Sequence, residues 1–175
     1  MTLKYKSNTY KQKIIMSTTS FIGVVVNPQD KGTVIEPNLK RFGKEISLEL
    51  DNPTFYKTNI NKSTEVMCIY HHFDGSPKLL GKTLLDEFDT YEKVINLVSF
   101  GDASSIIGDL AVLYSNFNNE KEWQYTKPKQ YKNEKDFESN CVESYIYLFK
   151  DGQWLVKQCY SINPEWKILS EVKKK

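Results

Sequence analysis

The chain has 175 residues, a length typical of one domain that can bury a single apolar core. Aromatic residues make up 13% of it, which is too large a share for a disordered protein. The net charge of +2 lies at the ends, because removing residues 1–15 (+4) and 171–175 (+2) leaves −4 on residues 16–170. This balance, without a basic patch, argues against direct nucleic-acid binding, and no apolar run approaches the roughly 18 residues of a membrane span.

Residues 1–15 are polar and basic and show no apolar periodicity, so we expect an N-terminal extension, with Met16 as an alternative start to Met1. No long apolar stretch follows its lysines, which argues against a secretory signal. The three cysteines form no CxxC pair, and all lie in apolar or strand-like runs: Cys68, Cys141 and Cys159. We therefore expect free, buried thiols and a cytoplasmic location.

Extended segments dominate the first part of the chain. Residues 21–27 and 66–70 are apolar, β-branched runs, which are typical of buried strands. Residues 42–50 alternate apolar and polar side chains, as a half-buried strand does. Residues 33–35 follow a Lys-Gly turn and predict a short return strand.

Two consecutive helices are expected at 77–88 and 90–100. In the first, Ser76 is the expected N-cap, a proline follows it, and leucines four residues apart give an apolar stripe. In the second, Asp89 is the expected cap, and a glutamate three residues later completes a capping box.

The last part of the chain returns to strands. Residues 102–105 predict a polar turn that caps a short helical turn, and 110–114 predict a short strand. The aromatic-rich runs 145–149 and 153–160 flank Asp151-Gly152. An Asp-Gly pair between alternating strands is among the strongest short-range signals for a β-hairpin.

These elements predict an α+β fold, with an antiparallel sheet of about four to six strands and the two helices packed on one face. The expected division is an N-terminal extension, one domain and a C-terminal tail: 1–15, 16–162 and 163–175. Within the domain, an insertion and an exposed excursion rich in Asn, Lys and Tyr stand out: 31–62 and 115–135.

The one site-like cluster lies between a strand and the first helix. His72 and Asp74, with Asp102 from the next polar turn, could hold a metal or perform acid–base catalysis, and a strand-to-helix junction suits an anionic ligand. The structural alternative is that His72 and Asp74 hydrogen-bond the turn and cap the helix, with Gly75 supplying a positive φ. His71 and His72 point to opposite faces of a strand, so we expect no shared metal, and no cofactor.

Two serines, Ser104 and Ser105, complete the candidate ligand-binding set. No GxSxG motif surrounds them, and no glycine-rich phosphate loop occurs in the chain. They either cap a turn or contact a ligand, and no complete catalytic set is expected.

Three aromatic residues lie in the exposed, lysine-containing excursion: Trp123, Tyr125 and Tyr131. They predict a partner-binding surface, because aromatic side chains beside basic ones anchor protein interfaces or stack on bases. The alternative is that they pin a long loop to the domain.

Four segments in chain order resemble small, largely uncharacterised proteins encoded by phages, prophages and plasmids. That family has an "MSTRS-IG" opening, a "YCHWDGYP…G…LL" motif, a "GD.SS" segment and a "YLF..G.W" hairpin. The matching segments are MSTTSFIG (16–23), IYHHFDGSP (69–77), VINLVSFGDASSI (94–106) and YLFKDGQWLV (147–156). The resemblance implies an accessory protein of a mobile genetic element.

The chain departs from this pattern at several positions. Phe73 stands in place of the motif's Trp, Ser76 in place of its Tyr, and His71 in place of its Cys. Some members carry a His-Arg-Asp stretch after the third strand, whereas residues 114–118 contain no His and no Asp. These differences weaken an enzymatic reading.

The sequence therefore favours a non-enzymatic binding protein that acts in counter-defence in the cytoplasm of a host cell. Its partner would be a host protein such as a CRISPR effector, inhibited on binding, or a small signalling nucleotide, sequestered from its receptor. Nucleic-acid and membrane binding are not expected, and a homodimer is one option. The alternative is a small hydrolase or nuclease using His72, Asp74 and Asp102.

Overall fold

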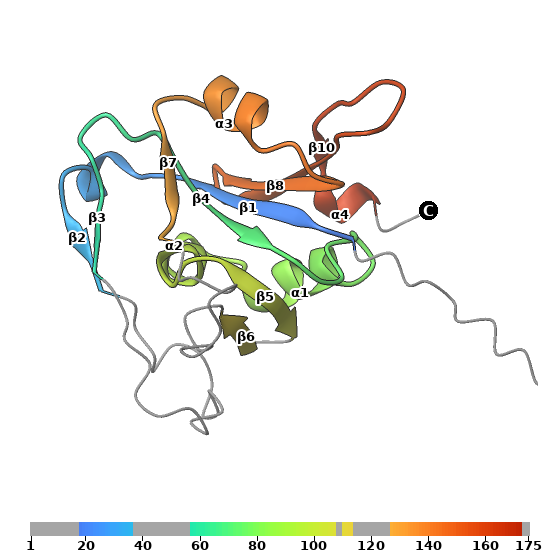
Figure 1. Cartoon of the computed structure of the whole chain (residues 1–175), viewed down its shortest axis with the longest axis horizontal. Helices are drawn as coiled ribbons and strands as arrows, with labels where there is room; N and C mark the ends of the chain where they lie inside the picture. The colour runs from blue at the N-terminus through green and yellow to red at the C-terminus, as the bar shows by residue number, and fades with distance from the viewer. Residues whose placement is uncertain (1–17, 37–56, 108–109, 114–126, 173–175) are drawn as a thin grey trace, which may run out of the picture.

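The computed structural model describes residues 18–36, 57–107, 110–113 and 127–172, and shows an α+β fold (Figure 1). The strands are β1 Ser20–Val25, β2 Val34–Ile35, β3 Thr58–Asn59, β4 Val66–His71, β5 Ala103–Ile107, β6 Leu110–Leu113, β7 Lys129–Tyr131, β8 Tyr145–Lys150, β9 Gln153–Gln158 and β10 Lys167–Ile168. The helices are α1 Leu80–Glu87, α2 Tyr91–Ser99, α3 Glu134–Asn140 and α4 Leu169–Val172, with a 3-10 turn at Pro28–Asp30.

The main sheet is mixed, not antiparallel. Seven strands follow the order β10-β9-β8-β1-β4-β5-β6, and β7 pairs with β4 off this path. β1 runs parallel to β8 and β4 runs parallel to β5, while the other pairs are antiparallel. The α+β class is therefore confirmed, but the expected sheet type and strand number are wrong. The chain returns from β4 to β5 through α1 and α2, and such a helical crossover delivers a parallel neighbour.

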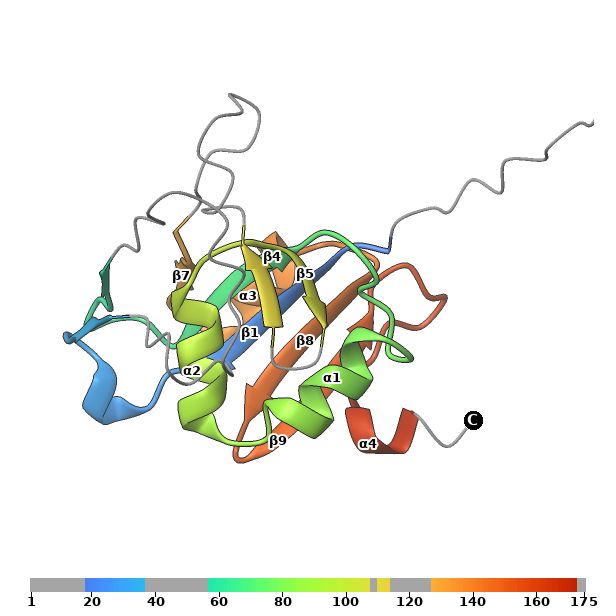
Figure 2. The ribbon, with the colours of Figure 1, turned by 90° about the horizontal axis from the view of Figure 1, so that it is seen from below.

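Helices cover both faces of this sheet (Figures 1 and 2). α1, α2 and α4 lie on one face, over the larger core, which contains fully buried residues of all three helices such as Leu84, Leu97 and Leu169. α3 lies on the other face and buries Phe137 in a smaller core with Phe21 and Cys68. The two expected helices do share a face, and α3 adds a layer over a segment that has no clear periodicity.

Both helix starts differ from the expected caps. α1 begins at Leu80, because the Ser76 carbonyl accepts hydrogen bonds from the backbone N–H groups of Leu79 and Gly81, which makes a turn of residues 76–79. At α2 the cap is Thr90, whose hydroxyl accepts from the Lys93 N–H at 3.4 Å, while Asp89 pairs with the Lys93 ammonium at 2.6 Å.

The predicted hairpin is confirmed. β8 and β9 pair from Tyr145↔Gln158 to Lys150↔Gln153. Asp151 and Gly152 both have positive φ, 51° and 76°, as a two-residue type I′ turn requires.

The segment 163–175 looks like a tail in the sequence, yet Lys167–Val172 belongs to the fold. β10 pairs with β9, and Leu169 is fully buried against α1 and β9. Its two apolar contacts with the larger core, from Leu169 and Val172, are too short a pattern to predict from sequence.

The structure describes part of the insertion and part of the excursion. In the insertion, β2 and β3 form a separate two-stranded ladder, while the strand expected at 42–50 lies outside the described residues. In the excursion, β7 pairs with the first half of β4, so residues 129–131 are part of the sheet.

Candidate functional site at one end of the sheet

Three loops leave the main sheet at the same end. The register places the start of β1, the end of β4, the start of β8 and the end of β9 side by side, through Ser20↔His71, Ser20↔Tyr145 and Tyr145↔Gln158. The segments 72–79, 141–144 and 159–166 therefore gather at one end of the molecule, on the right of Figure 1. We call these three segments the loop end.

The turn after β4 is built around Gly75. Its N–H donates to the Thr18 carbonyl at 2.7 Å, and its own carbonyl accepts from the Tyr147 hydroxyl at 2.8 Å. A Cβ at this position would lie 2.8 Å from the Ser20 Oγ and from the Thr18 carbonyl oxygen, so only glycine fits. The positive φ expected at Gly75 occurs instead at Asp74, at 60°. Gly75 is thus required for close packing and not for its φ.

His72 is half-buried beside two aromatic rings. Its Nδ1 lies 3.0 Å from the Tyr70 hydroxyl, and its ring meets the Phe73 ring edge-on at 4.3 Å. Its backbone N–H donates to the Ala103 carbonyl, which joins the turn to β5. The imidazole therefore takes part in an aromatic cluster at the rim of the sheet.

Asp102, Ser104 and Ser105 lie at the start of β5, a strand where a polar turn was expected. The Asp102 Oδ1 accepts from the Tyr70 backbone N–H at 2.7 Å, and the Ser104 carbonyl accepts from the Phe73 N–H at 2.9 Å. Asp102 is 8% exposed and Ser104 is buried, while Ser105 is half-buried. The structure thus brings Asp102 and Ser104 next to the turn.

The Asp102 contact has a structural consequence. β7 pairs with β4 only at residues 66–68, and β5 pairs with it at His71. The Asp102 carboxylate accepts the Tyr70 N–H in the gap between these two partners. A carboxylate that holds a buried backbone amide is less available as a general base.

The histidine that sequence reasoning missed is His71. It is 1% exposed, its Nδ1 lies 3.2 Å from the Ser20 Oγ, and within the described part of the chain its Nε2 has no hydrogen-bond partner. Burial, and then the charge of neighbouring His72, lower the pKa of His71 to about 4. Strand alternation with Met67 and Ile69, both in the larger core, was the available signal.

Ser20 and His71 form a serine–histidine pair, but one without access. Ser20 is fully buried, so no substrate reaches its hydroxyl. The pair links β1 to β4 under the loop end. Across the described ranges, no three His, Cys, Asp or Glu side chains group in a way that could hold a metal ion.

Exposed apolar side chains gather at the loop end. The structure describes six large hydrophobic residues as exposed, and five of them belong to these loops: Phe73, Leu79, Val142, Tyr160 and Ile162. Their exposed fractions run from 43% for Phe73 to 99% for Ile162. The sixth, Val34, lies in β2 at the opposite end.

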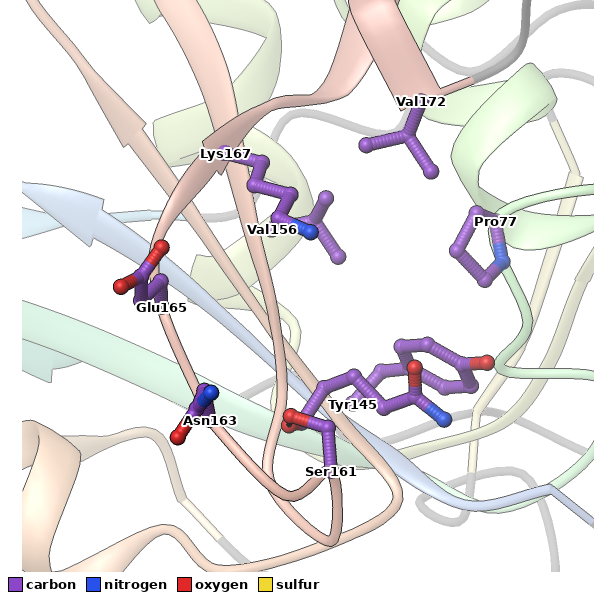
Figure 3. A pocket seen from close by; sticks show the side chains of 9 residues that line it. Pro77, Tyr145, Val156, Ser161, Asn163, Glu165, Lys167 and Val172 are labelled. Carbon is purple, nitrogen blue, oxygen red and sulfur yellow. Dashed lines mark hydrogen bonds between the residues drawn. The ribbon is translucent and has the colours of Figure 1, made fainter. Parts of the chain in front are cut away.

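A pocket of about 180 Å³ opens between the 159–166 loop and the start of α1. One side is apolar, from Pro77, Val156 and Val172. Figure 3 shows the Lys167 side chain extending beside Val156 and the Tyr145 ring reaching toward Pro77. The remaining lining is polar: Gln158, Ser161, Asn163 and Glu165.

The aromatic contact surface expected in the excursion is only partly described. Tyr131 lies in β7, is half-buried, and its ring centre is 6.0 Å from that of Phe137. It thus packs under α3. Trp123 and Tyr125 lie outside the described residues.

The chain matches no protein-family model, no curated protein and no solved structure. The resemblance to phage-encoded proteins therefore stays a prediction. None of the helices in the described ranges has the length and apolar character needed to cross a membrane.

Proposed function

We propose that the chain is a non-enzymatic accessory protein of a phage or another mobile element, and that it docks a folded host protein through its loop end. In its most specific form the proposal is counter-defence, in which docking inhibits a host defence protein such as a CRISPR effector. The mobile-element setting is supported by the four matching segments at 16–23, 69–77, 94–106 and 147–156.

The observation that carries the proposal is that five of the six exposed large apolar side chains described belong to the three segments of the loop end, where a pocket also opens. A soluble domain gains little from exposing Tyr160 and Ile162 on one loop, and such groups mark interaction sites when they lie together. Aromatic and aliphatic anchors that a partner buries supply most of the energy of a protein interface. The pocket beside them can receive a side chain of the partner.

The charges at the loop end favour a protein over a polyanion. The loops carry three acidic residues, Asp74, Glu143 and Glu165, against one lysine, Lys78. Nucleic acids and anionic bilayers require a basic surface, so an acidic rim around apolar anchors disfavours both.

The alternative ligand, a signalling nucleotide, has one observation in its favour. Lys167 projects at the pocket, where its ammonium could pair with a phosphate. The enzymatic alternative would require His72, Asp74 and Asp102 to act together, whereas the Asp102 carboxylate accepts a backbone N–H. We therefore favour docking over chemistry.

A pull-down from the host, with mass spectrometry of proteins and of small molecules released on denaturation, tests the proposal. Wild type and Val34→Asp, a variant at the opposite end, should recover the same host protein, and Ile162→Asp should lose it. Circular dichroism checks that each variant folds. Recovery of a nucleotide alone, or turnover that the His72→Ala/Asp74→Ala variant abolishes, would overturn the proposal.

A further inference from the structure

Two thiols meet in the smaller core under α3. The Sγ atoms of Cys68 and Cys141 are 3.7 Å apart, although the residues are separated by 73 positions in the chain. Cys68 lies in the middle of β4, and Cys141 is the residue that ends α3. Both side chains are fully buried and both thiols are free.

The surroundings shift the pKa values of the two thiols in opposite directions. The Cys141 Sγ lies 3.4 Å from the Tyr131 hydroxyl, which can donate to the thiolate. Hydrogen bonding with Cys68 and then with Tyr131 lowers the pKa of Cys141, and the charge of Lys129 adds to this effect. Hydrogen bonding with Cys141 and then burial raise the pKa of Cys68. Cys141 is therefore the thiol that ionises first, and a thiolate is the reactive form.

We propose that Cys68 and Cys141 are a redox modification site, at which a peroxide converts the two thiols into a disulfide that fastens the end of α3 to β4. This inference is independent of the proposed function.

The reaction balances with hydrogen peroxide as the oxidant. The Cys141 thiolate attacks one peroxide oxygen, the O–O bond breaks, hydroxide leaves, and Cys141 becomes a sulfenic acid. The Cys68 sulfur then attacks the Cys141 sulfur, the S–O bond breaks, and water leaves as the S–S bond forms. Both thiols are oxidised, and one peroxide is reduced to two waters.

The geometry needs only a local adjustment. The sulfurs have to approach from 3.7 Å to the roughly 2.05 Å of a disulfide. Cys141 has already left the helical conformation, with φ −110° and ψ 71°, and the next residue, Val142, is exposed. Opening of the 141–144 loop would therefore admit a small oxidant and let the Cys141 side chain turn.

The third thiol supplies a matched control. Cys159 is half-buried and lies beside the same loop, since its N–H donates to the Ser144 carbonyl. Burial raises the pKa of Cys159, and within the described ranges its thiol is free and the close sulfur pair is formed by Cys68 and Cys141. Cys159 should stay reduced under conditions that oxidise the pair.

The experiment treats the full chain with hydrogen peroxide and maps disulfides by peptide mass spectrometry without reduction. Two of the three free thiols should disappear in wild type and both thiols should disappear in Cys159→Ser, with Cys68 linked to Cys141. A reductant should reverse the change. Oxidised wild type should melt about 5 °C or more above the reduced protein, because a long loop is closed.

Several results would overturn the inference: a disulfide that includes Cys159, over-oxidation of Cys141 without a bond to Cys68, or three thiols that persist after treatment. Cys68→Ser and Cys141→Ser should each prevent the disulfide. Because the peptide map is made on wild type, the test does not depend on either variant folding.

Discussion

The two ends of the main sheet differ in what they expose. At the loop end, three connecting segments carry five exposed, large apolar side chains, and a pocket opens beside the 159–166 segment. At the opposite end, β8 and β9 are joined by a two-residue turn, and Val34 is the one exposed large apolar residue among those described. At the opposite end, β8 and β9 are joined by the shortest kind of hairpin turn. The loop end exposes more apolar surface than is needed to connect its strands. This difference is what a binding surface should look like.

Substitution of one glycine at each end should give the largest difference in stability between the two ends. Gly75→Ala at the loop end places a Cβ 2.8 Å from the Ser20 Oγ and the Thr18 carbonyl oxygen, so we expect unfolding free energy to fall by about 3 kcal/mol or more. Gly152→Ala at the opposite end meets no atom within 4 Å and is strained only by its positive φ, which costs about 1 kcal/mol. Urea denaturation measures both, and equal losses would contradict the packing account.

Acid should destabilise the loop end through His71. Its folded pKa of about 4 lies below the unfolded value of 6.5, so the unfolded chain binds the proton first. The contribution of His71 to the free energy of unfolding should therefore be constant above pH 6.5. It should fall by about 3 kcal/mol in total as the pH is lowered from 6.5 to 4. His71→Gln should remove this part of the pH dependence, and His72→Gln should reduce it only slightly, because burial is the larger cause of the lowered pKa. Denaturation curves collected across this pH range provide the measurement.

Substitutions of Asp102 test whether its carboxylate has a structural role. Asp102→Ala leaves the buried Tyr70 N–H without its acceptor, which should cost about 2 kcal/mol. Asp102→Asn keeps an acceptor oxygen and should lose less than half as much. Thermal melts give the comparison. If both variants were as stable as wild type, the carboxylate would have no role in holding β4.

The smallest effect is expected at the opposite end, in the cap of α2. Thr90→Ala removes the hydroxyl that accepts the Lys93 N–H, at a cost of about 1 kcal/mol. Asp89→Ala removes only an exposed ion pair and should cost less than Thr90→Ala. Neither change should alter partner binding. If Thr90→Ala were folded but failed to bind the partner, binding would not be confined to the loop end.

Local patterns predicted the local elements of this fold. β1, β4 and the β8–β9 hairpin follow from β-branched runs and an Asp-Gly turn, and α1 and α2 follow from apolar stripes. The two parallel strand pairs could not be predicted in this way. Alternation of apolar and polar residues shows which face of a strand is buried, but it does not show the direction of the strand beside it. β10 and α4 are held by non-local contacts around Leu169, which leave little local signal.

Only the neighbourhood of the candidate residues can be compared with the structure. The turn after β4 and the start of β5 do lie together, through hydrogen bonds from His72 and Phe73 to β5 and from Tyr70 to Asp102. The burial of His71 and its contact with Ser20 could not be predicted, since both depend on pairing between β1 and β4. The apolar loop residues drew no notice because each stands alone in sequence, and only the register brings Leu79 and Ile162 to one end.

The most direct test of the account is the affinity of the purified host partner for three forms of the full chain: wild type, Tyr160→Asp/Ile162→Asp and Val34→Asp. All three substitutions place a carboxylate on an exposed apolar residue, so only their position differs. We predict that Val34→Asp binds as wild type does, and that the loop variant binds about 100-fold or more weakly, as the loss of two anchors implies. Equal affinity of the loop variant and wild type would contradict docking through the loop end.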